Sequence, residues 1–232
     1  MTRDLFPAAL RQRLQPVGPE VPHPGRFATA PMPATLDEAL AVFTAACEAV
    51  GGRVSRMTTA DDVADLVLGY LEAPELQQEG DGTALAPFMT WDASQLPLPD
   101  LPALLEARGA AQLDGFVHES REDRADDCRR LDRARVGITG AHAALVDTGS
   151  VALVHGAGRP RLASLLPPVH VALVPVTRLH ATLGSLLHDE PELCREATNV
   201  VVVTGPSRTA DIEMTLTRGV HGPRFVHVVF VG

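Results

Sequence analysis

The sequence contains no lysine, so each of its 20 basic residues is an arginine. A Schiff base, a lysine-bound pyridoxal phosphate and a Walker-type phosphate loop all need a lysine amine. The missing lysine therefore excludes these kinds of site. Aromatic residues are also scarce, at 4% of the chain against 45% hydrophobic residues in total, which indicates a core built from Ala, Val and Leu.

Cysteine occurs only at Cys47, Cys128 and Cys194, and these positions are too far apart to match the spacing of a metal site. An iron–sulfur cluster cannot be built from them within one chain, so we expect no metal and no evident cofactor. The sequence has no leader with a charged start and an apolar run, and no apolar run long enough to cross a membrane. We expect a cytoplasmic protein with reduced thiols.

The charge balance is acidic, with 29 Asp and Glu residues and a formal net charge of −9. This balance disfavours a general surface for nucleic acids, but it leaves open a local arginine site for one small anion. The 232 residues can bury one substantial core. We expect a proline-rich arm at residues 1–34, which contain seven prolines, and a single α/β domain at 35–232.

Hydrophobic spacing in the rest of the chain predicts alternating strands and helices. Helices are expected at 36–50, 59–71, 101–108, 121–135, 161–166, 179–188 and 209–218. Strands are expected at 54–57, 84–89, 115–118, 151–154, 170–176, 200–204 and 225–231. Repeated strand–helix–strand units with right-handed crossovers predict a mostly parallel sheet between two layers of helices, a three-layer α/β/α fold.

The segment from Thr204 to Glu213 gives the strongest local signal for a ligand. It follows the run Val200–Val203, which is typical of a strand covered on both faces, and it reads as a tight loop and a helix start. Free backbone N–H groups at such a helix start, beside an arginine, can bind an anion. The predicted ligand-binding residues here are Gly205, Ser207, Arg208 and Thr209. Arg208 could equally form a structural pair with Asp211.

The turn at Asp147–Ser150 is the second candidate, with Thr148, Gly149 and Ser150 as ligand contacts. We expect it to lie beside the first loop. Asp147, Asp211 and Glu213 are the candidates for acid or base catalysis, although acids early in a helix also compensate its dipole. His221 follows the predicted helix 209–218, so it should lie at the opposite end of that unit.

Four ordered blocks of sequence resemble the LUD domain family, the LutC and YkgG proteins of lactate utilization. The blocks are Gly137–Gly140 with Asp147–Ser150, Leu165–His170, Gly205–Glu213 and Gly219–Pro223. The resemblance implies a fold similar to the superfamily of NagB, RpiA and the CoA-transferases. It also implies a role in oxidising L-lactate to pyruvate beside iron–sulfur oxidoreductase subunits, which would hold the clusters.

The resemblance does not settle whether this chain is an enzyme. A pentose-phosphate isomerase would be expected to have an active-site lysine, and a CoA-transferase a glutamate in a glycine-rich setting. This chain has no lysine, and Glu213 is the only acid near a ligand-type loop that could be considered. The alternatives are a non-catalytic assembly subunit, or an isomerase-like or CoA-transferase-like enzyme acting on another small anion.

Overall fold

The computed structural model describes residues 31–73, 76, 85–115, 120–210 and 216–232. Of the predicted arm at 1–34, residues 1–30 lie outside this part of the chain, so the boundary at 34 stays a prediction. Most of the strand predicted at 115–118 also lies outside it.

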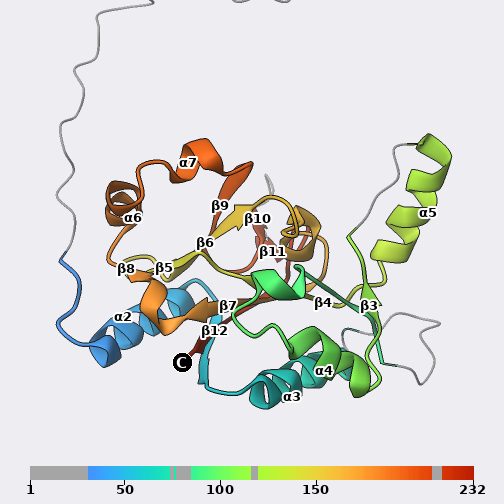
Figure 1. The fold of residues 1–232 in the computed structure, drawn as a ribbon, viewed down its shortest axis with the longest axis horizontal. Coiled ribbons are helices and arrows are strands. Elements are labelled where there is room, and N and C mark those ends of the chain that lie inside the picture. Colours follow the sequence, from blue (N-terminus) through green and yellow to red (C-terminus); the bar gives the residue numbers. More distant parts are fainter. Residues whose placement is uncertain (1–30, 74–75, 77–84, 116–119, 211–215) are drawn as a thin grey trace, which may run out of the picture.

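A parallel sheet of six strands forms the centre of the fold (Figure 1). The strand order is β1-β12-β7-β4-β2-β3, and every neighbouring pair is parallel. The strands are β1 (Arg53–Met57), β12 (Phe225–Val231), β7 (Val169–Pro175), β4 (Val136–Gly140), β2 (Phe88–Thr90) and β3 (Gln112–Leu113). The mostly parallel sheet predicted from the sequence is confirmed.

Both faces of this sheet are covered, because successive residues of a strand point to opposite sides. Leu173 of β7 packs in a cluster with helices α3 (Ala60–Leu71) and α4 (Leu101–Ala107). The next residue, Val174, packs in a cluster with Phe43 of α2 (Leu36–Ala49). Thr35 begins α2 with a capping box, in which its side chain and that of Glu38 each bond the other's backbone N–H. The three-layer α/β/α arrangement is therefore confirmed.

A second sheet of four strands lies on the α2 side, with the order β8-β5-β6-β9. Its strands are β8 (Leu179–His180), β5 (Ala143–Leu145), β6 (Ser150–His155) and β9 (Asn199–Val203). β6 is antiparallel to both β5 and β9. The expectation that residues 151–154 and 200–204 belong to the parallel sheet is wrong. Val202 is 38% exposed, because the valine run forms an edge strand rather than a strand covered on both faces.

The small sheet is covered on its outer side by two short helices. They are α6 (Leu183–Asp189), which contributes Leu186, and α7 (Leu193–Glu196), which contributes Leu193. The helix predicted at 179–188 is thus divided into β8 and α6. The helix predicted at 161–166 is a single 3-10 turn, η3 (Arg161–Ser164).

The charged stretch after residue 120 forms α5 (Arg121–Leu131), with Ser120 as its N-cap. Most of the described side chains in α5 are exposed, which is typical of a charged, solvated helix face. Within the described ranges, no helix combines the length and apolar character needed to cross a membrane.

The prediction of a helix at 209–218 is wrong. Residues Arg208–Ala210 and Leu216–Arg218 form strands β10 and β11, which pair antiparallel. The apolar pair Ile212 and Leu216 has helical spacing, but the segment is also rich in threonine, which favours strands. The pairing brings the end of β11 back to the start of β10, where Gly219 donates a hydrogen bond to the carbonyl of Ser207 at 3.0 Å.

Gly149 fixes how the turn before β6 packs. Its φ angle is +61°, in the left-handed region, and a Cβ at this position would overlap the backbone of Cys47 in α2. Only glycine combines this conformation with such close contact.

We predict that Gly149→Ala lowers the free energy of unfolding by about 3 kcal/mol, because it adds backbone strain and a steric overlap. Gly69→Ala is the matched control, since Gly69 lies in α3 with nothing within 4 Å of an added Cβ. It should raise stability by about 0.5–1 kcal/mol. Denaturant unfolding measures both changes, and equal effects at the two sites would contradict the packing described for Gly149.

Two buried histidines make stability depend on pH. His170 of β7 is fully buried, with its Nε2 atom 2.9 Å from the Thr139 hydroxyl. Burial, aided by the charge of His155, lowers the pKa of His170 to about 4. His227 of β12 contacts Ser55 and Tyr70, and burial followed by the charge of Arg53 lowers its pKa to about 4.

We predict that the unfolding free energy falls as pH decreases from about 6.5 to 4. In this window the unfolded chain binds more protons than the folded chain, so each histidine removes at most about 3 kcal/mol. His227→Gln cannot titrate and should reduce the slope of stability against pH, whereas replacing the exposed His188 by Gln should not. An unchanged slope in His227→Gln would show that this histidine is not kept neutral by the fold.

Candidate functional site

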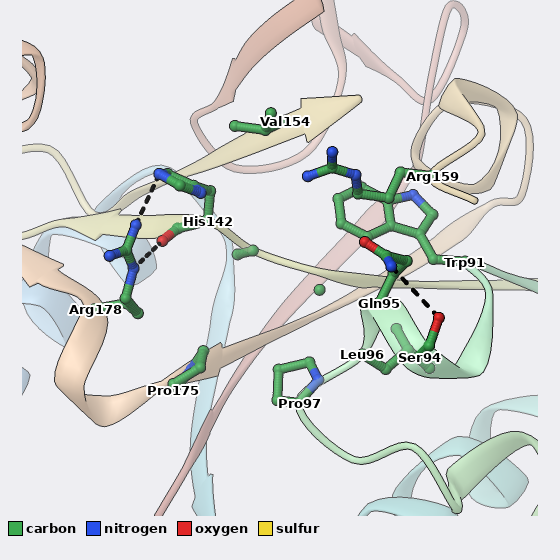
Figure 2. Close-up of a pocket in the computed structure, with 12 residues that line it drawn as sticks. Trp91, Ser94, Gln95, Leu96, Pro97, His142, Val154, Arg159, Pro175 and Arg178 are labelled. Atoms are coloured by element: carbon green, nitrogen blue, oxygen red, sulfur yellow. Dashed lines mark hydrogen bonds between the residues drawn. The ribbon is translucent and has the colours of Figure 1, made fainter. Parts of the chain in front are cut away.

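A cavity of about 490 Å³ opens at the carboxyl edge of the parallel sheet (Figure 2). β2 and β4 are neighbours in the parallel sheet. β3, which follows β2 in the chain, lies on one side of this pair, and β7 and β12, the next strands of this sheet after β4, lie on its other side. The carboxyl ends of β2 and β4 therefore flank a topological switch point, where open α/β sheets bind their ligands. The cavity is lined by Trp91, Ser94, Gln95, Leu96, Pro97, Gly140, Ala141, His142, Val154, Arg159, Pro175 and Arg178.

The walls of this cavity are fixed by close backbone packing. Trp91 directly follows β2, donates a hydrogen bond from its indole nitrogen to the carbonyl of Pro160 at 3.2 Å, and packs edge-on against His155. Gly140 ends β4, and a Cβ there would lie 2.8 Å from the carbonyl oxygen of Gln95. The turn η2 (Ala93–Gln95) can therefore lie directly against the end of β4.

A second cavity, of about 330 Å³, adjoins the first. His142, Val154 and Arg159 line both, so the two cavities adjoin at these residues, and we call the pair the groove. The second cavity lies against α7 and is lined in addition by Glu190, Pro191, Glu192, Leu193, Glu196 and Ala197.

Arg159 supplies an uncompensated positive charge to the groove. Among the described residues, its guanidinium forms no hydrogen bond or ion pair, and its Nε atom is buried without a partner. Burial lowers the pKa of the neighbouring His155, and the charges of Arg161 and Arg159 lower it further. An unpaired arginine in a cavity can bind a carboxylate or phosphate with two parallel hydrogen bonds.

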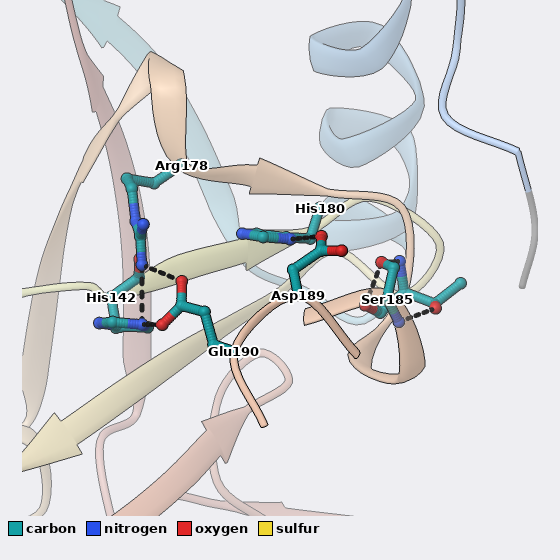
Figure 3. Close-up of polar contacts among 7 residues, drawn as sticks. His142, Arg178, His180, Ser185, Asp189 and Glu190 are labelled. Carbon is teal, nitrogen blue, oxygen red and sulfur yellow. Dashed lines mark hydrogen bonds and ion pairs between the residues drawn. The ribbon is translucent and has the colours of Figure 1, made fainter. Parts of the chain in front are cut away.

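His142, Arg178 and Glu190 form a hydrogen-bonded cluster at the other side of the groove (Figure 3). Arg178 donates from Nε to the carbonyl of His142 at 2.7 Å and from its NH2 group to Glu190 at 2.8 Å. The Nε2 atom of His142 lies 2.6 Å from the other oxygen of Glu190. Figure 2 shows Arg159 across the cavity from His142 and Arg178.

The proton on His142 decides which contacts the cluster makes. When Nε2 carries a proton it donates to Glu190, and when it does not it can accept from Arg178, which lies 2.7 Å away. Burial alone would raise the pKa of Glu190, but the hydrogen bonds and charges of His142 and Arg178 outweigh it and hold this pKa below its ordinary value. Glu190 therefore stays ionised and orients the imidazole.

The two loops predicted to bind a ligand do lie side by side. The hydroxyl of Ser150 is 2.8 Å from those of Thr148 and Thr204. Both loops pack against α2, because Gly149 lies against the backbone of Cys47 and Arg208 hydrogen-bonds the carbonyl of Val50 at the end of the helix. The cavities described above are lined by other residues.

The remaining predicted site residues are spread out. Asp147 is exposed, and its backbone N–H donates to Ala181. Thr209 lies in β10 rather than at a helix start, and Asp211 and Glu213 lie outside the described residues. Ligand binding and catalysis by these residues stay predictions.

His221 does not lie at the opposite end of its unit, as the sequence suggested. The antiparallel pairing of β10 and β11 brings residues 219–223 back, so that Ser207 donates a hydrogen bond to the carbonyl of Pro223 at 2.9 Å. The expectation rested on the helix at 209–218, which the structure replaces by this strand pair.

Sequence reasoning missed three members of the groove, Arg159, Arg178 and Glu190. A signal for Arg159 was present, because it follows the strand Ser150–His155 in a glycine-containing turn, Gly156–Arg159. The sequence offers no metal-type spacing around His142 that would single it out. Arg178 and Glu190 carry no local signal, since their contact depends on the folding of β8 and α6.

Comparison with known proteins gives a consistent family assignment. The family model described as LUD domain matches residues 40–231. Lactate utilization protein C of Macrococcus caseolyticus is 30% identical over 196 residues, which cover 82% of this chain and 76% of the relative. Lactate utilization protein C of an Exiguobacterium species is 39% identical over 103 residues, which cover 43% of this chain and 45% of the relative.

The solved structure of a DUF162 family protein from Deinococcus radiodurans supports the fold. It superposes with a TM-score of 0.57 at 22% sequence identity and covers 86% of this chain and 100% of its own. The match of the family model to residues 40–231 includes nearly all of the described fold. The chain therefore belongs to the LUD domain family.

Proposed function

We propose that this protein acts in lactate utilization and that the groove binds the carboxylate of lactate or pyruvate. The relatives named lactate utilization protein C support the general role. The observation that carries the binding site is the guanidinium of Arg159, which faces both cavities and has no partner among the described residues. A small carboxylate would supply the missing negative charge and hydrogen-bond acceptors.

In this proposal His142 accepts the proton of the lactate hydroxyl. Oxidation to pyruvate releases two electrons, the hydroxyl proton, which His142 accepts, and the C2 proton, which passes to the solvent. A base must therefore lie near the hydroxyl, and a neutral imidazole oriented by a carboxylate is suited to that task. The Nε2 contact with Glu190, at 2.6 Å, supports the assignment. Arg178 acts as a positioning residue, since it holds both the carbonyl of His142 and the carboxylate of Glu190.

The electron pair needs an acceptor, and we propose that iron–sulfur partner proteins provide it. This follows from the resemblance to the lactate-utilization proteins rather than from any contact in the fold. The protein would then bind and orient the substrate, and the partner subunits would carry the redox centres.

Arg159→Gln tests the binding site. We predict that lactate and pyruvate raise the thermal unfolding midpoint of the wild type. Loss of a charged hydrogen-bonding partner should weaken the apparent affinity of Arg159→Gln about 10- to 100-fold. Thermal titration of both proteins with each acid measures the effect.

Arg208→Gln is the matched control, because it removes an arginine from the loop predicted at 205–209. Arg208 bonds the carbonyl of Val50, so its loss should change stability and leave lactate affinity unchanged. Weakened binding in Arg208→Gln with normal binding in Arg159→Gln would move the site to the 205–209 loop. Absence of any stabilisation of the wild type by lactate or pyruvate would contradict the proposed binding.

Co-purification with the candidate iron–sulfur subunits tests the proposed partnership. We predict a stable complex that oxidises lactate, in which Arg159→Gln keeps assembly but loses at least 90% of the activity, or about 10-fold. An assembly subunit without a catalytic role would instead give a complex whose activity is insensitive to Arg159→Gln. That result would contradict a substrate-binding role for this chain.

A further inference from the structure

The two cavities of the groove differ in chemistry on either side of Arg159. Among the described residues, no acidic side chain lines the first cavity, and much of its wall is apolar, with Leu96, Pro97, Val154 and Pro175 among its lining residues. Leu96 and Val154 are each only 5% exposed, so they form a firm part of the wall. A ligand group that enters this cavity beyond Arg159 meets an apolar surface.

The second cavity carries the acidic side chains Glu190, Glu192 and Glu196. Glu190 is neutralised by Arg178 and Glu192 by Arg195. Among the described residues, Glu196 has no ion pair. Of the two arginines that line the groove, Arg178 is paired with Glu190, so Arg159 carries the uncompensated positive charge. A second negative charge on a ligand would find no further unpaired positive charge in the described groove, because Arg178 is already bound to Glu190. It would meet neutral side chains in the first cavity or carboxylates in the second, and both contacts are unfavourable.

The first cavity is much larger than lactate. Lactate has the volume of three or four liquid water molecules, roughly 100 Å³. The first cavity alone is about 490 Å³, so lactate would fill only a fraction of it. The free volume adjoins the apolar wall, where burial of each further methylene group would stabilise a complex.

We infer that the groove takes a class of 2-hydroxy and 2-oxo monocarboxylates with apolar side chains longer than the methyl group of lactate. The carboxylate binds Arg159, the hydroxyl or keto oxygen faces His142, and the side chain lies along Leu96, Pro97, Val154 and Pro175. This inference rests on the proposed function, because it assumes that the groove binds a 2-hydroxy acid at Arg159. It adds that a longer apolar side chain on the ligand raises the affinity and that a second carboxylate on the ligand lowers it.

A ligand series tests this inference on the full chain. Dissociation constants are measured by thermal titration for L-lactate, 2-hydroxybutyrate, 2-hydroxypentanoate and L-malate. We expect the affinity to rise about two- to fourfold for each added methylene group. L-malate should bind at least about 10-fold more weakly than 2-hydroxybutyrate, which has the same number of carbon atoms.

Ser94→Trp provides the structural arm of the test. Ser94 is exposed on η2 and lines the first cavity, so a tryptophan there should fill it without disturbing the buried core. We expect this variant to lose the preference for longer chains, so that its dissociation constants for L-lactate, 2-hydroxybutyrate and 2-hydroxypentanoate agree within about twofold. Thr58→Trp is the matched control, because Thr58 is exposed after β1 and lines neither cavity. It should keep the preference.

The possible results distinguish a failure of the inferred chain-length preference from a failure of the proposed lactate-binding site. Lactate binding with affinities that stay flat or fall with chain length would overturn the inference and leave the proposed function standing. Equal binding of L-malate and 2-hydroxybutyrate would also overturn it. If no acid of the series binds the wild type, the proposed binding site fails as well. A preference that survives in Ser94→Trp would show that the side chain does not occupy the first cavity.

Discussion

The hydrogen bond from Arg178 to the carbonyl of His142 joins the two places where the chain leaves the parallel sheet. β4 passes into β5 of the small sheet through Ala141 and His142, and β7 passes into β8 through the turn η4 (Val176–Arg178). A second bond, from the backbone of Ala141 to the carbonyl of Leu173 at 2.7 Å, connects the same two crossings. Residues of both crossings line the first cavity, namely Ala141, His142, Pro175 and Arg178.

The charges of the groove follow from this arrangement. Arg178 is held by the backbone of His142 and by Glu190, so its charge is compensated within the fold. Arg159 lies in a turn after β6 and has no such carboxylate among the described residues. One arginine thus maintains the structure and the other remains available to a ligand. His142 is held by Arg178 and lines both cavities together with Arg159, as the proposed proton exchange with a bound substrate requires.

Local patterns in the sequence predicted the parts of the fold that depend on local physics. The cap at Thr35, the apolar strand at 169–175 and the helix at 60–71 were all predictable from periodicity and capping. The small sheet was not, because an antiparallel edge strand such as Val200–Val203 has the same composition as a buried parallel one. The segment after Arg208 carried a helical spacing that long-range pairing overrode.

The site was predicted only in its general chemistry. An arginine beside a turn at the end of a strand was expected, but the sequence favoured Arg208, whose guanidinium bonds the end of α2, over Arg159. The partnership of His142 with Glu190 joins residues 48 positions apart, and no local pattern encodes it.

The most direct test of lactate binding at Arg159 is a crystal structure of the protein with bound lactate. If lactate binds in the groove as we propose, its carboxylate has electron density within hydrogen-bonding distance of the Arg159 guanidinium, and its hydroxyl points toward His142. Density for lactate at the loop around Arg208, with the groove filled only by water, would contradict it.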